Sequence, residues 1–138
     1  MTYLIDTNVV SEARKARGNP AVKAWLSRAK GEDLYISVLL LGELRRGIDL
    51  LARHDPQQAA SYERWLTRLH RDYADRILPV SADVAEEWGR LNVPDPLPVV
   101  DGLLAATARV HDLTLVTRNS SDFARAGVRL LNPFEAEP

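Results

Sequence analysis

The chain has 138 residues, of which 46% are hydrophobic and 27% charged, and its formal net charge is −1 at pH 7. This length and composition fit one globular domain with its own core. Because the charge is nearly balanced, it does not indicate a general nucleic-acid binder, and such a partner would need a local basic patch. The lack of cysteine excludes disulfides, thiolate metal sites and cysteine nucleophiles.

Nothing in the sequence indicates secretion or a membrane span. The start of the chain lacks a basic segment followed by an apolar one. The apolar runs are also far shorter than the roughly 18 residues that a spanning helix needs. We therefore expect a cytoplasmic protein without membrane contact, with residues 1–138 as a single domain.

Short apolar segments alternate with helical patterns along the chain. The predicted strands are residues 3–5, 34–36, 77–80, 114–117 and 128–131. The predicted helices are residues 8–16, 20–29, 38–53, 56–69, 82–91 and 99–110. Two prolines in residues 92–97 indicate a loop. This alternation predicts an α/β fold whose parallel sheet is covered by helices on both faces.

Three carboxylates stand among residues that normally face a core. Asp6 ends the first predicted strand, Glu43 interrupts an apolar run, and Asp101 lies in the first turn of the most apolar helix. We expect these side chains to be buried. A buried carboxylate is costly unless it is paired, protonated or bound to a metal, and no cation neighbours Asp6 or Asp101. The pattern predicts a divalent metal held by acids from distant segments, and thus a metal-dependent enzyme.

The predicted topology brings these acids to one edge of the sheet. Ligands of parallel sheets bind beyond the carboxyl ends of the strands. Asp6 follows the first strand, Ser37 ends the second shortly before Glu43, and Thr117 ends the fourth. Magnesium prefers oxygen ligands and keeps several waters, which are the reagents of hydrolysis.

Each acid also has a structural explanation. Asp6 could cap the following helix, and Glu43 could pair with Arg46 on its own helix. The helix macrodipole could stabilise Asp101, and Asp122 could cap the segment that begins after it. The occurrence of all these acids together favours the metal site over four unrelated structural roles.

Other chemistries lack support. The three histidines have no metal-binding spacing and are expected at the surface, and the three tryptophans are expected to pack in the core. These residues are His54, His70, His111, Trp25, Trp65 and Trp88. The sequence contains no nucleophile elbow, dinucleotide-binding glycine motif or phosphate-binding loop.

Four segments carry a family pattern: residues 3–8 (YLIDTN), 37–47 (SVLLLGELRRG), 97–108 (LPVVDGLLAATA) and 115–123 (LVTRNSSDF). In order and spacing they resemble PIN-domain proteins. The resemblance is closer to the toxins of VapBC-type (type II) toxin–antitoxin modules, including their FitB-like branch, and covers essentially the whole chain. It implies a PIN-like α/β/α sandwich with a short-stranded parallel sheet, and ribonuclease activity that depends on Mg²⁺ or Mn²⁺.

The resemblance also implies roles for individual residues. The residues implied to be catalytic and metal-binding are Asp6, Glu43, Asp101 and Asp122. The residues implied to support them are Thr7, Thr117 and Asn119. Many relatives carry an acid where this chain has Asn119. The fourth metal-site position therefore stays open between Asn119 and Asp122, and we expect Asp122 to serve the metal and Asn119 to position a water.

Our hypothesis from the sequence is a toxin endoribonuclease in which metal-activated water attacks the RNA phosphodiester in line and leaves 5′-phosphate and 3′-hydroxyl ends. Basic side chains that could contact the RNA backbone, or else form a solvated surface, are Arg14, Lys15, Arg17, Arg45, Arg46 and Arg118. The resemblance implies a homodimer and a cognate, VapB-like antitoxin whose tail enters the acidic groove.

Two alternatives belong to other classes. One is an inactive PIN-like module that binds nucleic acid or a partner, which the intact acids disfavour. The other is a metal-dependent DNA nuclease or phosphatase. The segment Asp6-Thr7-Asn8 lacks the second acid of a phosphatase D-x-D motif, which counts against a phosphatase.

Overall fold

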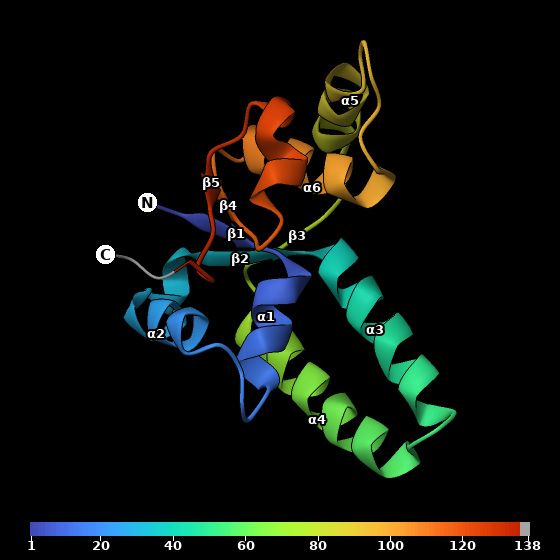
Figure 1. The fold of residues 1–138 in the computed structure, drawn as a ribbon. Helices are drawn as coiled ribbons and strands as arrows, with labels where there is room; N and C mark the ends of the chain where they lie inside the picture. The colour runs from blue at the N-terminus through green and yellow to red at the C-terminus, as the bar shows by residue number, and fades with distance from the viewer. Residues whose placement is uncertain (136–138) are drawn as a thin grey trace.

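A five-stranded sheet lies between two layers of helices in the computed structural model, which describes residues 1–135 (Figure 1). The strands are β1 (Tyr3–Ile5), β2 (Leu34–Ser37), β3 (Ile77–Leu78), β4 (Thr114–Val116) and β5 (Leu130–Leu131). The α-helices are α1 (Thr7–Arg14), α2 (Pro20–Arg28), α3 (Val38–Ala52), α4 (Pro56–Asp72), α5 (Ala82–Leu91) and α6 (Val99–Val110). Two 3₁₀ helices are η1 (Gly31–Asp33) and η2 (Ser120–Ala126). The predicted α/β/α sandwich is confirmed.

The strands are parallel and lie in the order β3-β2-β1-β4-β5. The central strand β1 pairs with β2, where Tyr3 is opposite Leu34, and with β4, where Ile5 is opposite Val116. From β1 the sheet extends through β2 and β3 on one side and through β4 and β5 on the other, so the order in which the chain adds strands changes direction at β1. In open parallel sheets a cleft forms at this reversal, outside the carboxyl ends of the strands.

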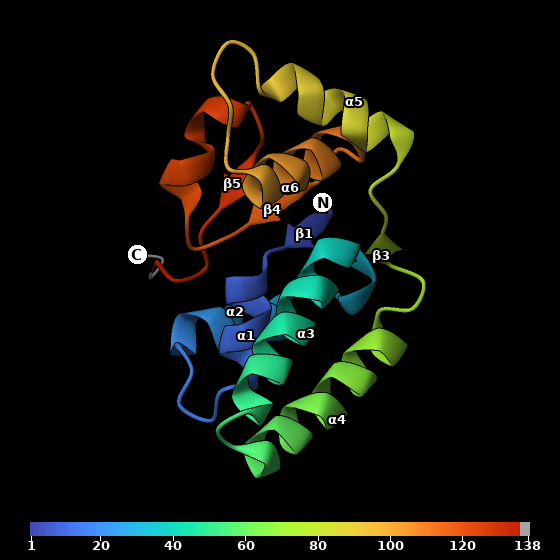
Figure 2. The same cartoon turned by 90° about the vertical axis from the view of Figure 1, so that its right-hand side faces the viewer.

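Alternate side chains of the strands divide the core between the two faces of the sheet. Ile5 and Val116 belong to the cluster that packs with α1, α2, α3 and α4. Leu4 and Leu115 belong to the cluster that packs with α6 and η2. Figure 2 shows α1 to α4 on one side of the sheet, and α5 and α6 on the other. Each central strand is thus buried on both faces.

Several boundaries differ from the prediction. The first helix begins at Thr7 because Asp6 caps it, and it ends at Arg14. The two edge strands, β3 and β5, are shorter than predicted, and residues 120–126 form a 3₁₀ helix that the sequence pattern did not indicate. The histidines are exposed as predicted. The tryptophans are half-buried, and Trp25 and Trp65 pack against the core as predicted. Within residues 1–135, no helix has the length and hydrophobicity of a membrane span.

Candidate active site

A cavity of about 280 Å³ opens beside the carboxyl ends of β1 and β4. Its lining includes most of the predicted site residues, contributed by the end of β1, by α3, by the start of α6 and by the segment after β4. The lining residues are Asp6, Thr7, Asn8, Glu43, Val100, Asp101, Leu104 and Asn119. The acids at positions 6, 43 and 101 therefore converge from distant parts of the sequence, as the predicted topology requires.

Asp6 serves both as a helix cap and as a buried acid of this cavity. Its Oδ1 accepts a hydrogen bond from the Thr7 backbone N–H at 2.7 Å, and its Oδ2 accepts one from the Thr117 hydroxyl at 2.8 Å. The residue is only 7% exposed. Burial raises the pKa of Asp6 and the charge of Glu43 raises it further, while the two hydrogen bonds oppose that change. The predicted burial is thus confirmed, and the cap hypothesis is also correct.

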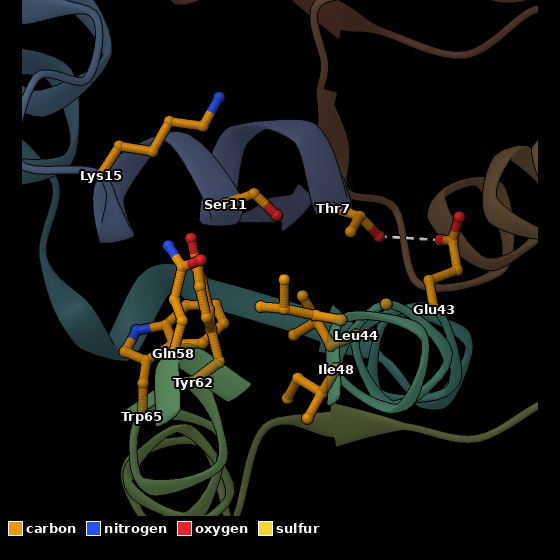
Figure 3. A pocket seen from close by; sticks show the side chains of 11 residues that line it. Thr7, Ser11, Lys15, Glu43, Leu44, Ile48, Gln58, Tyr62 and Trp65 are labelled. Atoms are coloured by element: carbon orange, nitrogen blue, oxygen red, sulfur yellow. Dashed lines mark hydrogen bonds between the residues drawn. The ribbon is translucent and has the colours of Figure 1, made fainter. Parts of the chain in front are cut away.

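Glu43 is exposed, so the prediction that it is buried was wrong. The core face of α3 carries Leu40, Leu44 and Ile48, spaced by one helical turn, and Glu43 projects from another side of the helix. The pair with Arg46, which was the structural alternative for Glu43, is also absent among the described side chains. Instead, the Thr7 hydroxyl donates to Glu43 Oε1 at 2.8 Å (Figure 3). Thr7 thereby ties α1 to α3 at the rim of the cavity.

Asp101 lies half-buried in the first turn of α6. The loop before α6 is held by Asn92, whose Oδ1 accepts a hydrogen bond from the Leu97 backbone N–H at 2.8 Å. Burial raises the pKa of Asp101, and the negative charges of Asp6 and Asp122 add to the increase. Asp101 is therefore the acid on which the charges of the other two act.

Asn119 and Asp122 occupy different places at the site. Asn119 lines the cavity, and its backbone N–H donates to the Thr117 hydroxyl at 3.1 Å. Asp122 is exposed, does not line the cavity and contributes its charge to the surroundings of Asp101. The 3₁₀ helix begins before Asp122, at Ser120, and has no side-chain cap. The hypothesis that Asp122 caps the following segment was therefore wrong.

Asn8 is a lining residue that sequence analysis did not single out. Its Nδ2 donates to Asp6 Oδ2 at 3.4 Å, and its Oδ1 accepts from the Arg118 backbone N–H at 3.2 Å. Asn8 thus connects the ends of β1 and β4. The only sequence signal was its place in the YLIDTN segment.

None of the basic residues predicted to contact RNA lines the acidic cavity. The Arg14 guanidinium lies 4.3 Å from the centre of the Tyr62 ring. The Arg45 guanidinium donates two hydrogen bonds to the Glu63 carboxylate, from Nη1 to Oε1 at 2.9 Å and from Nη2 to Oε2 at 2.7 Å. The other candidates are exposed; they are Lys15, Arg17, Arg46 and Arg118. Lys15 also pairs with Glu12 at 3.2 Å, and the Arg118 guanidinium lies 4.5 Å from the centre of the Phe134 ring. Arg14, Lys15, Arg45 and Arg118 thus have intramolecular partners, and the RNA contacts stay a prediction.

The donor chemistry of the site suits a hard divalent cation. Among residues 1–135, no three acidic or histidine side chains lie close enough to bind one ion directly. In that same part of the chain no lysine or arginine forms an ion pair with Asp6, Glu43 or Asp101. Magnesium typically binds one or two carboxylates and keeps several waters. The oxygen-only donors therefore fit Mg²⁺ or Mn²⁺ if some carboxylates act through water.

Comparison with known proteins places this chain in a family. The PIN domain profile matches residues 3–128, and the chain belongs to the PIN-domain family. It is 35% identical to toxin FitB of Neisseria gonorrhoeae, across 95% of this chain and 97% of FitB. It is 31% identical to VapC ribonuclease Y4jK of Sinorhizobium fredii, across 96% and 97%.

The structural comparison agrees. The crystal structure of FitAcB from Neisseria gonorrhoeae contains a chain that superimposes with a TM-score of 0.89 at 34% identity. The match covers 98% of this chain and all of that one. The resemblance to PIN-domain toxins that the sequence motifs indicated is confirmed.

Proposed function

We propose that this protein is the toxin of a type II toxin–antitoxin module and acts as an endoribonuclease that depends on Mg²⁺ or Mn²⁺. The main observation behind the proposal is the cavity beside the carboxyl ends of β1 and β4. There Asp6, Glu43 and Asp101 meet without a cationic partner in the described chain. Membership of the PIN-domain family and similarity to proteins named as toxin and ribonuclease support it.

The residues that would hold the ion are Asp6, Glu43, Asp101 and Asp122, directly or through water. The chemistry that such an ion supplies when bound is a lowered pKa for water and stabilisation of charge on the phosphoryl oxygens. The carboxylate of Asp6 accepts hydrogen bonds from Thr7, Thr117 and Asn8, which fix its orientation, and when deprotonated it would supply negative charge to the ion. Thr7 and Thr117 act by orienting acids, and we assign Asn119 to the positioning of a water.

Glu43 is suited to orient the attacking water. Its Oε1 is engaged by Thr7, while its exposed position leaves Oε2 accessible from solvent. In the proposed reaction the water oxygen bonds to phosphorus as the P–O3′ bond breaks, and the 3′-oxygen gains a proton. The products carry 5′-phosphate and 3′-hydroxyl ends.

A chelation experiment tests the activity. Purified protein should cleave an RNA substrate in Mg²⁺ or Mn²⁺, lose cleavage in excess chelator and regain it when the metal is restored. The variant Glu43→Gln, which keeps the exposed side chain but removes its charge, should remove most of the activity. Undiminished cleavage in chelator would refute the metal-dependent mechanism.

We also propose an antitoxin partner and a homodimer. Unpaired acids form a ready site for a guanidinium, which can pair with a carboxylate through two hydrogen bonds. Exposed valines near α6 offer an apolar surface to a second copy of the chain; these are Val93, Val99 and Val100. For the homodimer, light scattering of the toxin alone should give twice the chain mass. For the antitoxin, co-expression with the product of the adjacent gene should relieve toxicity and give a stable complex. Failure to recover a partner with fully folded toxin would argue against the antitoxin.

A further inference from the structure

A second, larger cavity adjoins the acidic one. It has a volume of about 410 Å³ and lies between α1, α3 and α4 (Figure 3). Thr7 and Glu43 line both cavities, and the hydrogen bond between them lies at the boundary. A substrate whose phosphate lies at the acids would therefore reach this cavity with the nucleoside next to that phosphate.

The walls of the second cavity are mostly apolar, with polar groups among them. Leu44, Ile48 and Leu51 form aliphatic parts of the wall, and Tyr62 and Trp65 of α4 contribute aromatic rings. Hydrogen-bonding groups come from Ser11, Lys15 and Gln58. Within residues 1–135, the side chains of Ser11 and Gln58 make no hydrogen bond to the protein, so they can bind a ligand.

The shape of the cavity is fixed by contacts outside it. Arg14 lies over the Tyr62 ring at 4.3 Å, and its Nη2 donates to the Ser61 hydroxyl at 2.8 Å, so α1 is joined to α4. Arg45 and Glu63 join α3 to α4 by two hydrogen bonds. Because all three helices are connected, the cavity is preformed, and a ligand need not order it.

We propose that this cavity binds a nucleobase of the RNA, the one attached to the nucleotide adjacent to the cleaved phosphate. The inference rests on the proposed ribonuclease function and names where the substrate sequence is read. Apolar and aromatic walls suit the face of a base. Hydrogen bonds from Ser11 and Gln58 to the edge of the base would decide which base is preferred.

Gly47 allows the cavity to be filled without disturbing the fold. It lines the cavity, and a Cβ atom added there meets no heavy atom within 4 Å. Leucine also favours a helix more than glycine does, so Gly47→Leu should fold. The matched control is Gly89→Leu on α5, another exposed helical glycine with open space around its Cβ atom and no part in either cavity.

Two measurements test the proposal on the full chain with Mg²⁺. The first compares binding of the four nucleoside 5′-monophosphates with binding of ribose 5-phosphate, which lacks a base and cannot be cleaved as RNA. At least one nucleotide should bind roughly 10-fold more tightly than ribose 5-phosphate, the scale of one base stacking on an aromatic side chain. Gly47→Leu should abolish that advantage, and Gly89→Leu should keep it.

The second measurement maps cleavage sites in a random-sequence RNA pool. Wild type and Gly89→Leu should share one base preference beside the cleaved bond, and Gly47→Leu should lose it and cut preferred sites roughly 10-fold more slowly. Nucleotide binding that Gly47→Leu removes, in a wild type that cuts no RNA, would support the base subsite and refute the nuclease.

Two other results would overturn the base subsite. One is RNA cleavage with an unchanged preference in Gly47→Leu, together with nucleotides that bind no better than ribose 5-phosphate. The other is a Gly47→Leu variant that binds nucleotides and cleaves RNA normally but no longer captures a co-expressed partner protein. In that case the cavity would belong to the partner.

Discussion

The carboxyl group of Asp101 is subject to opposing electrostatic effects. Its place at the N-terminus of α6 favours the charged form by about 0.3–1 kcal/mol. Burial and the charges of Asp6 and Asp122 disfavour that form, and together they raise the pKa of Asp101 above its ordinary value. The balance indicates that a charged Asp101 destabilises the metal-free protein at neutral pH. A metal would reverse that effect by neutralising the repulsion.

The variant Asp101→Asn separates these effects, because it removes the charge with little change of shape. In chelator at neutral pH, we expect it to melt at a higher temperature than wild type. With Mg²⁺ it should lose roughly 100-fold or more of the RNA cleavage, the scale of removing one group that stabilises charge in a transition state. The measurements are thermal melting in chelator and cleavage rates in metal. Retained activity with a stability loss of about 0.3–1 kcal/mol would show that Asp101 only serves the helix.

Asp122 and Asn119 can be distinguished by their metal dependence. Asp122 carries charge near Asp101 but does not line the cavity, whereas Asn119 lines it and is neutral. If Asp122 serves the metal, Asp122→Asn should raise the metal concentration for half-maximal cleavage and leave the metal-free melting temperature nearly unchanged. Asn119→Ala should instead lower the maximal rate at saturating metal. An unchanged metal titration curve for Asp122→Asn would remove Asp122 from the site.

At the scale of the elements, the position of α6 depends on close packing against α5. A Cβ atom added at Gly102 would lie 3.0 Å from Trp88 Cδ1 and 3.1 Å from its Nε1. We expect Gly102→Ala to destabilise the fold by about 1–2 kcal/mol, because overpacking exceeds the gain in helix propensity. Gly89→Ala, with open space around its Cβ atom, should instead stabilise by up to about 1 kcal/mol.

Denaturant unfolding of both variants tests this contact. The double variant Gly102→Ala with Trp88→Phe should recover part of the loss, because a smaller ring leaves room for the added methyl group. Equal stabilisation by alanine at positions 102 and 89 would mean that Trp88 moves aside without cost. The start of α6, and with it Asp101, would then be less firmly placed than the close contact indicates.

The elements differ in how far the sequence could predict them. The helix at residues 99–110 was predicted at its true bounds, since a loop with prolines precedes it and apolar residues fill it. The placement of Asp6 at the ligand-binding edge of the sheet also followed from the parallel topology, whereas Asp101 was placed only in the first turn of a helix. The exposure of Glu43 did not follow from the sequence. The apolar run before it divides between two core clusters, because Leu39 packs with one and Leu40 with the other. The second cavity was missed because its walls come from three helices, and the packing of α1 on the pair α3 and α4 cannot be read from the sequence pattern.

At the scale of the whole molecule, the acidic site costs stability that a metal can restore. The raised pKa values of Asp6 and Asp101 mean that the folded protein binds protons more tightly than the unfolded chain does. Their favourable contribution is fully present below the ordinary aspartate pKa of 3.8 and is lost as the pH rises through the raised values. Both acids lose their protons as the pH rises, and a divalent cation binds only the deprotonated form.

We therefore expect Mg²⁺ or Mn²⁺ to raise the melting temperature more at about pH 7.5 than at about pH 5. At a metal concentration about 100 times its dissociation constant, the gain should be about 2.7 kcal/mol, or roughly 10 °C for a chain of this length. The measurement is the difference in melting temperature with and without metal at each pH. The stability contributions of groups that do not interact with the metal cancel in this difference. Asp101→Asn should reduce that difference at the higher pH. A metal-induced shift equal at both pH values would mean that the ion binds away from these carboxylates.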